Sequence, residues 1–166
     1  MPAPKSMLAE FDTEMATTRR VLERVPSDKG EWKPHPKSFA IGHLAQLIAR
    51  MPAWVAAAIK SSSLDLGAFQ GYSFEKTEAL LDTFDKNVNE AREALASATD
   101  ATFAGPWSLK RGDQVFFTLP VGAVVRQNIN HLVHHRGQMT VNLRLLDIPV
   151  PSIYGPTADE RMPARS

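Results

Sequence analysis

The spacing of apolar side chains predicts four long helices, the first of which runs from Ser6 to Val25. Its apolar positions recur three and four residues apart, as expected for one face of a helix: Met7, Leu8, Phe11, Met15, Val21 and Leu22. Pro26 and Gly30 then break the pattern, because proline lacks a backbone donor and glycine is a poor helix former. We therefore expect an extended connection through the two prolines of WKPHPKS before the next helix.

The second predicted helix is the most apolar part of the chain. It runs from a cap at Ser38 to about Lys60, and Pro52 inside it predicts a kink or a local break. The stretch from Ile41 to Ile59 has nearly the length of a membrane span, but it contains a histidine, a glutamine, an arginine and a proline. These residues are costly in lipid, so a buried amphipathic helix is expected instead.

Two further helices are predicted in the second half of the chain. The third runs from Phe74 to about Ala98, with Ser73 or Thr77 as its cap. The fourth runs from about Pro120 to Leu146, and Pro120 stands where a proline in the first helical turn is tolerated. Both contain a stripe of apolar residues that would face the other helices.

The connections between these helices are long and show little periodicity. Residues 61–73 are expected to form a loop, and KRGDQVFFT predicts a short hairpin around Arg111–Asp113. The Pro-rich C-terminal tail after Asp147 is expected to cross the surface without regular structure. Four long helices with almost no strand signal predict an all-α fold, a four-helix bundle in which residues 1–166 form one domain.

Composition narrows the classes of function. The 166 residues are 43% hydrophobic and 22% charged, which is typical of a globular domain with its own core. A net charge of +1 argues against a protein that binds nucleic acid through phosphate contacts. The chain has no cysteine and no apolar leader, which fits a cytoplasmic protein that does not bind membranes. Any thiol chemistry would need a thiol from outside.

Three of the five histidines lie within NHLVHHRGQ, residues 130–138. Because a helix turns by ~100° per residue, His131 and His135 project together beside the apolar stripe of the fourth helix. His134 projects toward the exposed side. Three amide side chains project into the same sector as the pair and are candidates for a substrate pocket: Asn128, Gln138 and Asn142.

The His131/His135 pair has two interpretations from its spacing alone. Two histidines four residues apart on a helix can bind one divalent ion, although a catalytic site usually needs three protein ligands. Alternatively, hydrogen bonds across the bundle satisfy both rings, since an unpaired buried imidazole or amide costs about 1–3 kcal/mol. In either case, the two histidines and the three amide side chains beside them are expected to line a cavity between helices.

Two other residue types are expected to stabilise the fold. Arg136 projects to the far side of the apolar stripe from His135, where we expect it to anchor a neighbouring helix or the C-terminal tail by an ion pair. The three tryptophans are expected to be core or dimer contacts, and one of them is a candidate wall of the cavity: Trp32, Trp54 and Trp107.

NHLVHHRGQ, followed by LRLLDIPVPSIYGPTADE, resembles the C-terminal half of the DinB-like proteins, which are grouped with the YfiT-like metalloenzymes. WKPHPKSFAIGHLAQLIARMPAW resembles the second-helix region of that family, and the resemblance spans roughly residues 8–160. It implies a bundle with non-sequential helix order, frequent homodimers, and nickel or zinc held by three histidines. Two of these ligands map onto His131 and His135. The resemblance also implies a small-molecule substrate, and some relatives use a low-molecular-weight thiol as cosubstrate.

The third metal ligand departs from the family pattern. The second-helix histidine of the family stands where this chain has Leu47, and His43 lies one turn earlier. A shift of one turn moves a ligand by ~5.4 Å, whereas metal-ligand distances tolerate only ~0.2 Å. Two hypotheses follow. One is a divalent-metal-dependent thiol transferase or hydrolase with His131, His135 and His43 as ligands. The other is a metal-free binding or stress-response module that has lost the second-helix ligand.

Overall fold

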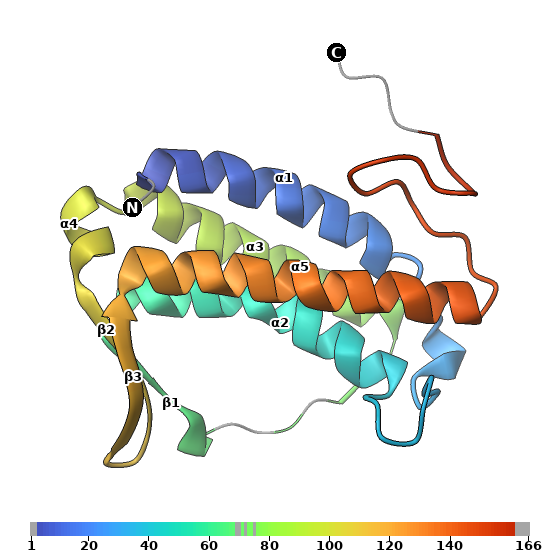
Figure 1. Ribbon diagram of the computed structural model, residues 1–166, viewed down its shortest axis with the longest axis horizontal. Helices are drawn as coiled ribbons and strands as arrows, with labels where there is room; N and C mark the ends of the chain where they lie inside the picture. Colours follow the sequence, from blue (N-terminus) through green and yellow to red (C-terminus); the bar gives the residue numbers. More distant parts are fainter. Residues whose placement is uncertain (1–2, 69–70, 72, 75, 162–166) are drawn as a thin grey trace.

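Four long helices form the body of the protein in a computed structural model that describes residues 3–68, 71, 73–74 and 76–161. They lie side by side as a bundle, with α5 against α2 and α1 against α3 (Figure 1). Their bounds fall within about three residues of the predicted ones: α1 (Pro4–Leu22), α2 (Ile41–Lys60), α3 (Thr77–Ser97) and α5 (Val121–Leu145).

The N-termini of α2 and α3 are capped by the segment between α1 and α2, not by their own side chains. The first amide of α2 donates to the carbonyl oxygen of Trp32 at 2.8 Å. The amide of Thr77, the first residue of α3, donates to Ser27 Oγ at 3.0 Å. Neither helix has a side-chain cap of its own. The predicted caps, Ser38 for α2 and Ser73 or Thr77 for α3, were therefore wrong, because a distant segment satisfies these amides first.

Pro52 lies inside α2 without interrupting it. The helix continues to Lys60, and Figure 1 shows a change of direction near its middle. Proline removes one helical hydrogen bond and loosens the preceding turn. In that turn the carbonyl oxygen of Ala49 accepts a hydrogen bond from Asn87 Nδ2 of α3 at 2.9 Å. The predicted local break is absent.

The all-α prediction was wrong for the connections, which pair as a three-stranded sheet. β1 (Ser63–Asp65), β2 (Pro106–Arg111) and β3 (Gln114–Pro120) lie in the order β1-β2-β3, with β1 parallel to β2 and β2 antiparallel to β3. The hairpin was predicted, and its turn contains Gly112 with a φ of 56°, a conformation that favours glycine. β1 was predicted to be loop, because three residues are too few to show a period.

Three short helical segments complete the described chain: η1 (Ser27–Lys29), η2 (Leu66–Ala68) and α4 (Asp100–Ala104). Thr99 caps α4, and its hydroxyl accepts from the amide of Thr102 at 3.1 Å. α4 leads directly into β2. It therefore positions the sheet against the end of the bundle where α5 begins, as Figure 1 shows.

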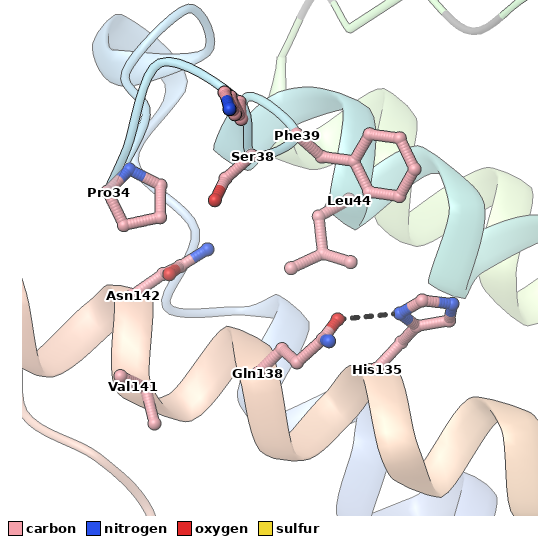
Figure 2. Close-up of a pocket in the computed structure, with 9 residues that line it drawn as sticks. Pro34, Ser38, Phe39, Leu44, His135, Gln138, Val141 and Asn142 are labelled. Atoms are coloured by element: carbon pink, nitrogen blue, oxygen red, sulfur yellow. Dashed lines mark hydrogen bonds between the residues drawn. The ribbon is translucent and has the colours of Figure 1, made fainter.

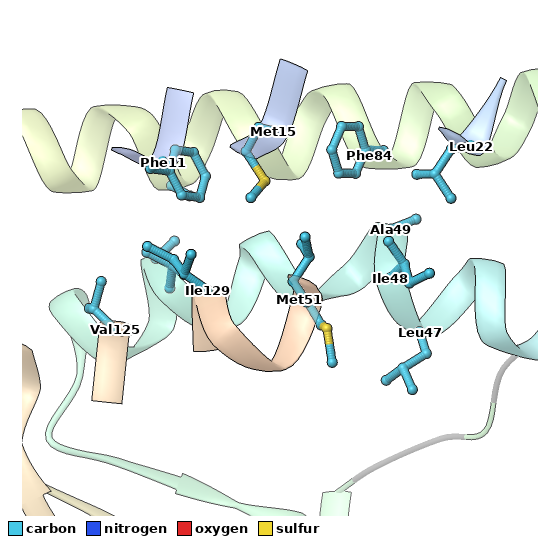
Figure 3. Close-up of a cluster of buried hydrophobic side chains, with 14 of the residues drawn as sticks. Phe11, Met15, Leu22, Leu47, Ile48, Ala49, Met51, Phe84, Val125 and Ile129 are labelled. Carbon is cyan, nitrogen blue, oxygen red and sulfur yellow. The ribbon is translucent and has the colours of Figure 1, made fainter. Parts of the chain in front are cut away.

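The apolar core fills the space between the four long helices. Phe11, Phe84 and Ile129 are at most 2% exposed and come from three different helices. Leu47 of α2 is 8% exposed, and Figure 3 shows its side chain pointing away from Phe84. No helix in the described part of the chain is long and apolar enough to cross a membrane. α2 packs in the core instead, as predicted from the polar residues that make it unsuitable for a membrane.

Arg136 joins α5 to α1 and to the C-terminal tail. It is 1% exposed, and its Nη1 lies 2.7 Å from the carboxylate of Glu14 on α1. Its Nη2 donates to the hydroxyl of Tyr154 at 2.7 Å, and that hydroxyl donates to the Glu14 carboxylate at 2.9 Å. The prediction that Arg136 anchors a neighbouring helix or the tail is confirmed on both counts.

Candidate functional site

The two histidines predicted as ligands on α5 lie against each other. Their Nε2 atoms are 2.9 Å apart and their ring centroids 4.6 Å apart. The i, i+4 spacing on one helix explains this contact, because it places both side chains on one face. His135 is 8% exposed, whereas His131 is exposed and lies against Trp54 of α2 with ring centroids 6.2 Å apart.

A chain of hydrogen bonds continues from this pair. His135 Nδ1 lies 2.8 Å from Gln138 Oε1 (Figure 2). Gln138 Nε2 lies 3.1 Å from His134 Nε2. An amide oxygen only accepts, so His135 carries its proton on Nδ1 and accepts on Nε2. His131 therefore donates from its Nε2, and Gln138 donates its amide to His134. One set of proton positions with three neutral rings satisfies every contact.

The electrostatics favour neutral rings. Loss of surrounding water is the largest cause that lowers the pKa of His131, and the charges that His135 and His134 would carry lower it further. Loss of water also lowers the pKa of His135, against the hydrogen bond to Gln138, which raises it. Because both pKa values fall below the ordinary histidine value, both rings are uncharged at neutral pH.

Two cavities flank the pair. The first has a volume of about 410 Å³ and lies between the loop before α2 and the C-terminal half of α5, where His135, Gln138 and Asn142 meet Phe39 and Leu44 (Figure 2). The second has a volume of about 220 Å³ and lies under the sheet. His131 and Asn128 line it beside the aromatic rings of Trp54, Trp107 and Phe117. The predicted pocket amides thus divide between two cavities, two in the first and one in the second.

His43 stands apart from the pair. Its ring stacks on Phe39, with centroids 4.5 Å apart and an interplanar angle of 9°. It lines a separate cavity with Glu31 and Lys33. Among residues 3–68, 71, 73–74 and 76–161, no three histidine or acidic side chains are grouped so as to hold a metal ion. The described residues therefore bring His131 and His135 together but not His43.

The fit of a divalent ion is partial. Imidazole nitrogens bind such an ion at ~2.0–2.1 Å, so two nitrogens at right angles around it are about 2.9 Å apart. The Nε2 atoms of His131 and His135 have this separation. Leu47, which the resemblance places at the third ligand position, is an apolar side chain in the core. Two donors fit the ion, and the three-histidine centre that the resemblance implies does not fit the described residues.

The aromatic wall under the sheet was only partly foreseen. Trp54 and Trp107 both line the second cavity, as one tryptophan was expected to do. Phe117 and Leu109 were missed because the hairpin was not connected with the site. Trp107 and Leu109 alternate with polar residues along β2, a period of two that is typical of a strand with one buried face. That alternation is the signal that would have placed the strand against the cavity.

Comparison with known proteins identifies the family. The DinB family matches residues 1–164. The protein YrdA of Bacillus subtilis (strain 168), itself uncharacterized, is 26% identical over 159 residues, which cover 92% of this chain and 89% of YrdA. The crystal structure of a DinB-like protein from Bacillus cereus ATCC 10987 has a TM-score of 0.73 at 22% identity, covering 92% of this chain and 98% of that one.

A third similar fold belongs to an enzyme. The structure of a mutant of the mycothiol-dependent maleylpyruvate isomerase has a TM-score of 0.63 at 12% identity, over 84% of this chain and 61% of that one. At this identity the likeness concerns the fold alone. The match over residues 1–164, together with the bundle and its histidine pair, leads to one conclusion: this chain belongs to the DinB family.

Proposed function

We propose that this DinB-family protein binds a small organic molecule at the His131/His135 pair without a resident metal ion. The observation that carries the proposal is the hydrogen-bond chain from His131 through His135 to Gln138, which uses both facing ring nitrogens. The buried Leu47 at the third ligand position supports it as well. A pair whose two facing nitrogens are engaged with each other has no need of an ion at that point to be satisfied.

The proposed chemistry of the pair is proton acceptance. A neutral imidazole has one N–H, so His131, which donates from Nε2, has a lone pair on Nδ1. A bound molecule can donate a hydrogen bond or a proton to that atom. The 2.9 Å contact then lets His135 share the resulting charge, and Gln138 holds the His135 ring in place. Such an arrangement suits a general base near neutral pH.

A second candidate is a divalent-metal-dependent transferase or hydrolase with a low-molecular-weight thiol as cosubstrate. The tautomer of His135 favours it, because Nδ1–H on an amide oxygen with Nε2 unprotonated is the arrangement of a metal-bound histidine. The 2.9 Å spacing and the fold of the mycothiol-dependent isomerase support it too. A nickel or zinc ion would lower the pKa of a bound water or thiol. Its third ligand would come from the substrate or from solvent.

Metal analysis separates the two candidates. We would dialyse tag-free protein with Ni²⁺ or Zn²⁺, remove free metal and measure metal per chain. The wild type should retain much less than one ion per chain. Leu47→His should restore a third imidazole and retain about one, since three histidines form a complete site. Leu47→Asn is the matched control, because it removes the leucine without supplying a ligand of the same kind.

Two outcomes would decide against the metal-free proposal. Stoichiometric metal in the wild type, lost in His131→Ala, would establish the second candidate. Equal metal retention in Leu47→His and Leu47→Asn would show that Leu47 does not stand at the third ligand position. Each variant should first be checked by circular dichroism, because a polar side chain at a buried position lowers the free energy of unfolding by about 1–3 kcal/mol.

A further inference from the structure

We propose that the larger of the two cavities beside the histidine pair binds a small amphiphilic carboxylate, whose charged end is held by Asn142, Ser38 and Lys37. This names a class of molecule for the site, and in that respect it rests on the proposed function. The cavity has a volume of about 410 Å³ and lies between the loop before α2 and the C-terminal half of α5 (Figure 2). That volume is within the ~300–1,000 Å³ range of pockets that enclose a small organic molecule.

The side-chain amide of Asn142 is the first observation. Asn142 is 6% exposed and lines the cavity, yet its amide has no hydrogen-bond partner among the residues that the structure describes. The amide is not sealed inside the protein, in contrast to the side-chain oxygen of Gln46, and Figure 2 shows it pointing into the space below Ser38. A buried amide without a partner costs free energy. A ligand oxygen in the cavity would supply the acceptor that its N–H groups lack.

Two further donors face the same cavity from the loop before α2. Ser38 does not cap α2, and its half-buried hydroxyl has no hydrogen-bond partner in the described part of the chain. Lys37 lines the cavity as well and forms no ion pair with a described residue. An amide, a hydroxyl and an ammonium group can all donate to one carboxylate, which only accepts and has about four acceptor sites.

The charge of the lining favours an anion. Lys37 is the charged side chain that lines the cavity, and no aspartate or glutamate lines it among the described residues. His135, on the opposite side, is neutral at neutral pH because its pKa is lowered, chiefly by loss of surrounding water. A carboxylate that enters therefore meets one cation and two neutral donors, and no negative charge repels it.

The remaining walls define the body of the ligand. Four apolar side chains line the cavity: Pro34, Phe39, Leu44 and Val141. Phe39 is 50% exposed, so an apolar group placed over it would remove apolar surface from water. Along α5, Asn142 and His135 are seven residues apart, which is about 10 Å. A ligand with its carboxylate at Asn142 therefore needs several carbon atoms to reach the histidine pair.

The test compares three probes: hexanoate, hexanamide, which lacks the charge, and acetate, which lacks the apolar body. Binding to the wild-type protein is followed by the side-chain amide signals of Asn142 in ¹H–¹⁵N NMR spectra, which Asn142→Leu identifies by their loss. Hexanoate should shift these signals and bind about 3- to 10-fold more tightly than hexanamide, because a charged acceptor roughly doubles the strength of a hydrogen bond. Acetate should bind most weakly.

Three variants separate the groups that hold the carboxylate. Asn142→Leu replaces the amide by an apolar group with the same branching and should weaken hexanoate about 10-fold or more. It should not lower the free energy of unfolding, because the amide that it removes has no partner in the fold. Lys37→Met should weaken hexanoate about threefold and leave hexanamide unchanged. Lys33→Met is the matched control, since Lys33 belongs to the same loop but lines a different cavity.

Several outcomes would overturn the proposal. Equal affinity for hexanoate and hexanamide would mean that the cavity does not select a carboxylate, and acetate binding as tightly as hexanoate would exclude an apolar body. A clear loss of unfolding free energy in Asn142→Leu would show that the amide is paired inside the fold.

The same measurements distinguish this inference from the proposed function. Hexanoate binding that Asn142→Leu weakens, together with stoichiometric metal in the wild type, would support the carboxylate site and contradict the metal-free proposal. Absence of hexanoate binding in a protein that retains no metal would overturn the carboxylate site alone.

Discussion

His135 holds the hydrogen-bond chain together, because it is the ring with a partner on both nitrogens. It donates to Gln138 and accepts from His131, so a second proton on its ring keeps the contact only if His131 gives up its own Nε2 proton. The pKa of each of the two rings is lowered in the fold, chiefly by loss of surrounding water. The folded protein therefore binds fewer protons than the unfolded chain at and below the ordinary histidine pKa of ~6.5.

This difference predicts that acidification destabilises the protein. The free energy of unfolding rises with pH wherever the unfolded state binds more protons, so it should fall as the pH is lowered from about 7.5 to about 5.5. Urea denaturation at each pH measures it. The double variant His131→Asn, His135→Asn should show a weaker dependence over the same range. A pH dependence as steep in the double variant as in the wild type would contradict the assignment.

At the residue scale, helix geometry predicted what lies along α5 and little else. His131 and His135 are four residues apart on one helix, so their contact follows from the sequence alone. The position of His43 depends on the path of the loop before α2, which brings Phe39 onto its ring. Asn128 projects with the pair, as predicted, yet it lines the cavity under the sheet, whereas Asn142 lines the other cavity. The spacing of apolar residues along a helix does not show which cavity each polar residue lines.

At the scale of elements, Asp65 connects β1 to the hairpin. Its carboxylate accepts from the amide of Gly67 at 2.8 Å and from the amide of Gly112, in the turn, at 3.2 Å. These two backbone hydrogen bonds lower the pKa of Asp65. Their contribution to stability is therefore present above the ordinary aspartate pKa of ~3.9 and is lost as the pH falls below it. Short strands depend on such contacts, which hydrophobic patterns do not show.

Removing this carboxylate should loosen the sheet locally. In Asp65→Ala the amide hydrogens of Gly67 and Gly112 should exchange with solvent about threefold faster or more, the effect of losing one hydrogen bond. Hydrogen exchange followed by NMR measures both sites. Asp113→Ala changes an exposed aspartate in the same turn that does not bond the Gly112 amide, and serves as the control. Equal exchange at Gly112 in both variants would show that Asp65 does not hold the turn.

At the scale of the whole molecule, the buried arginine connects segments that are far apart in sequence. Arg136 of α5 contacts Glu14 of α1 and Tyr154 of the tail. The tail is also held by ion pairs from α1 and α5 to Glu160 and Asp159. The spacing of apolar residues and the resemblance both predicted the bundle, and the sequence predicted the arginine as an anchor. The partners of Arg136 follow only from the packing of helices. The homodimer stays a prediction.

Arg136→Met should lower the free energy of unfolding by about 3–5 kcal/mol, because it leaves the Glu14 carboxylate, only 12% exposed, without its cation. Arg126→Met is the matched control on the same helix. Arg126 pairs with Glu10 of α1 at a half-exposed position, so its loss should cost at most about 1 kcal/mol. Urea denaturation of both variants measures the difference. Similar losses of unfolding free energy in the two variants would mean that burial does not increase the contribution of the ion pair.

The parallel pairing of β1 with β2 has a consequence for the order of folding. The hairpin closes over a turn of two residues, whereas β1 meets β2 only after α3 and α4 have been placed between them. Loop-closure entropy grows with the length of chain enclosed, and non-local pairing slows folding. The aromatic cavity needs β1, the hairpin and α5 together. A newly synthesised chain would therefore acquire this cavity only after α5, its last helix, has joined the bundle.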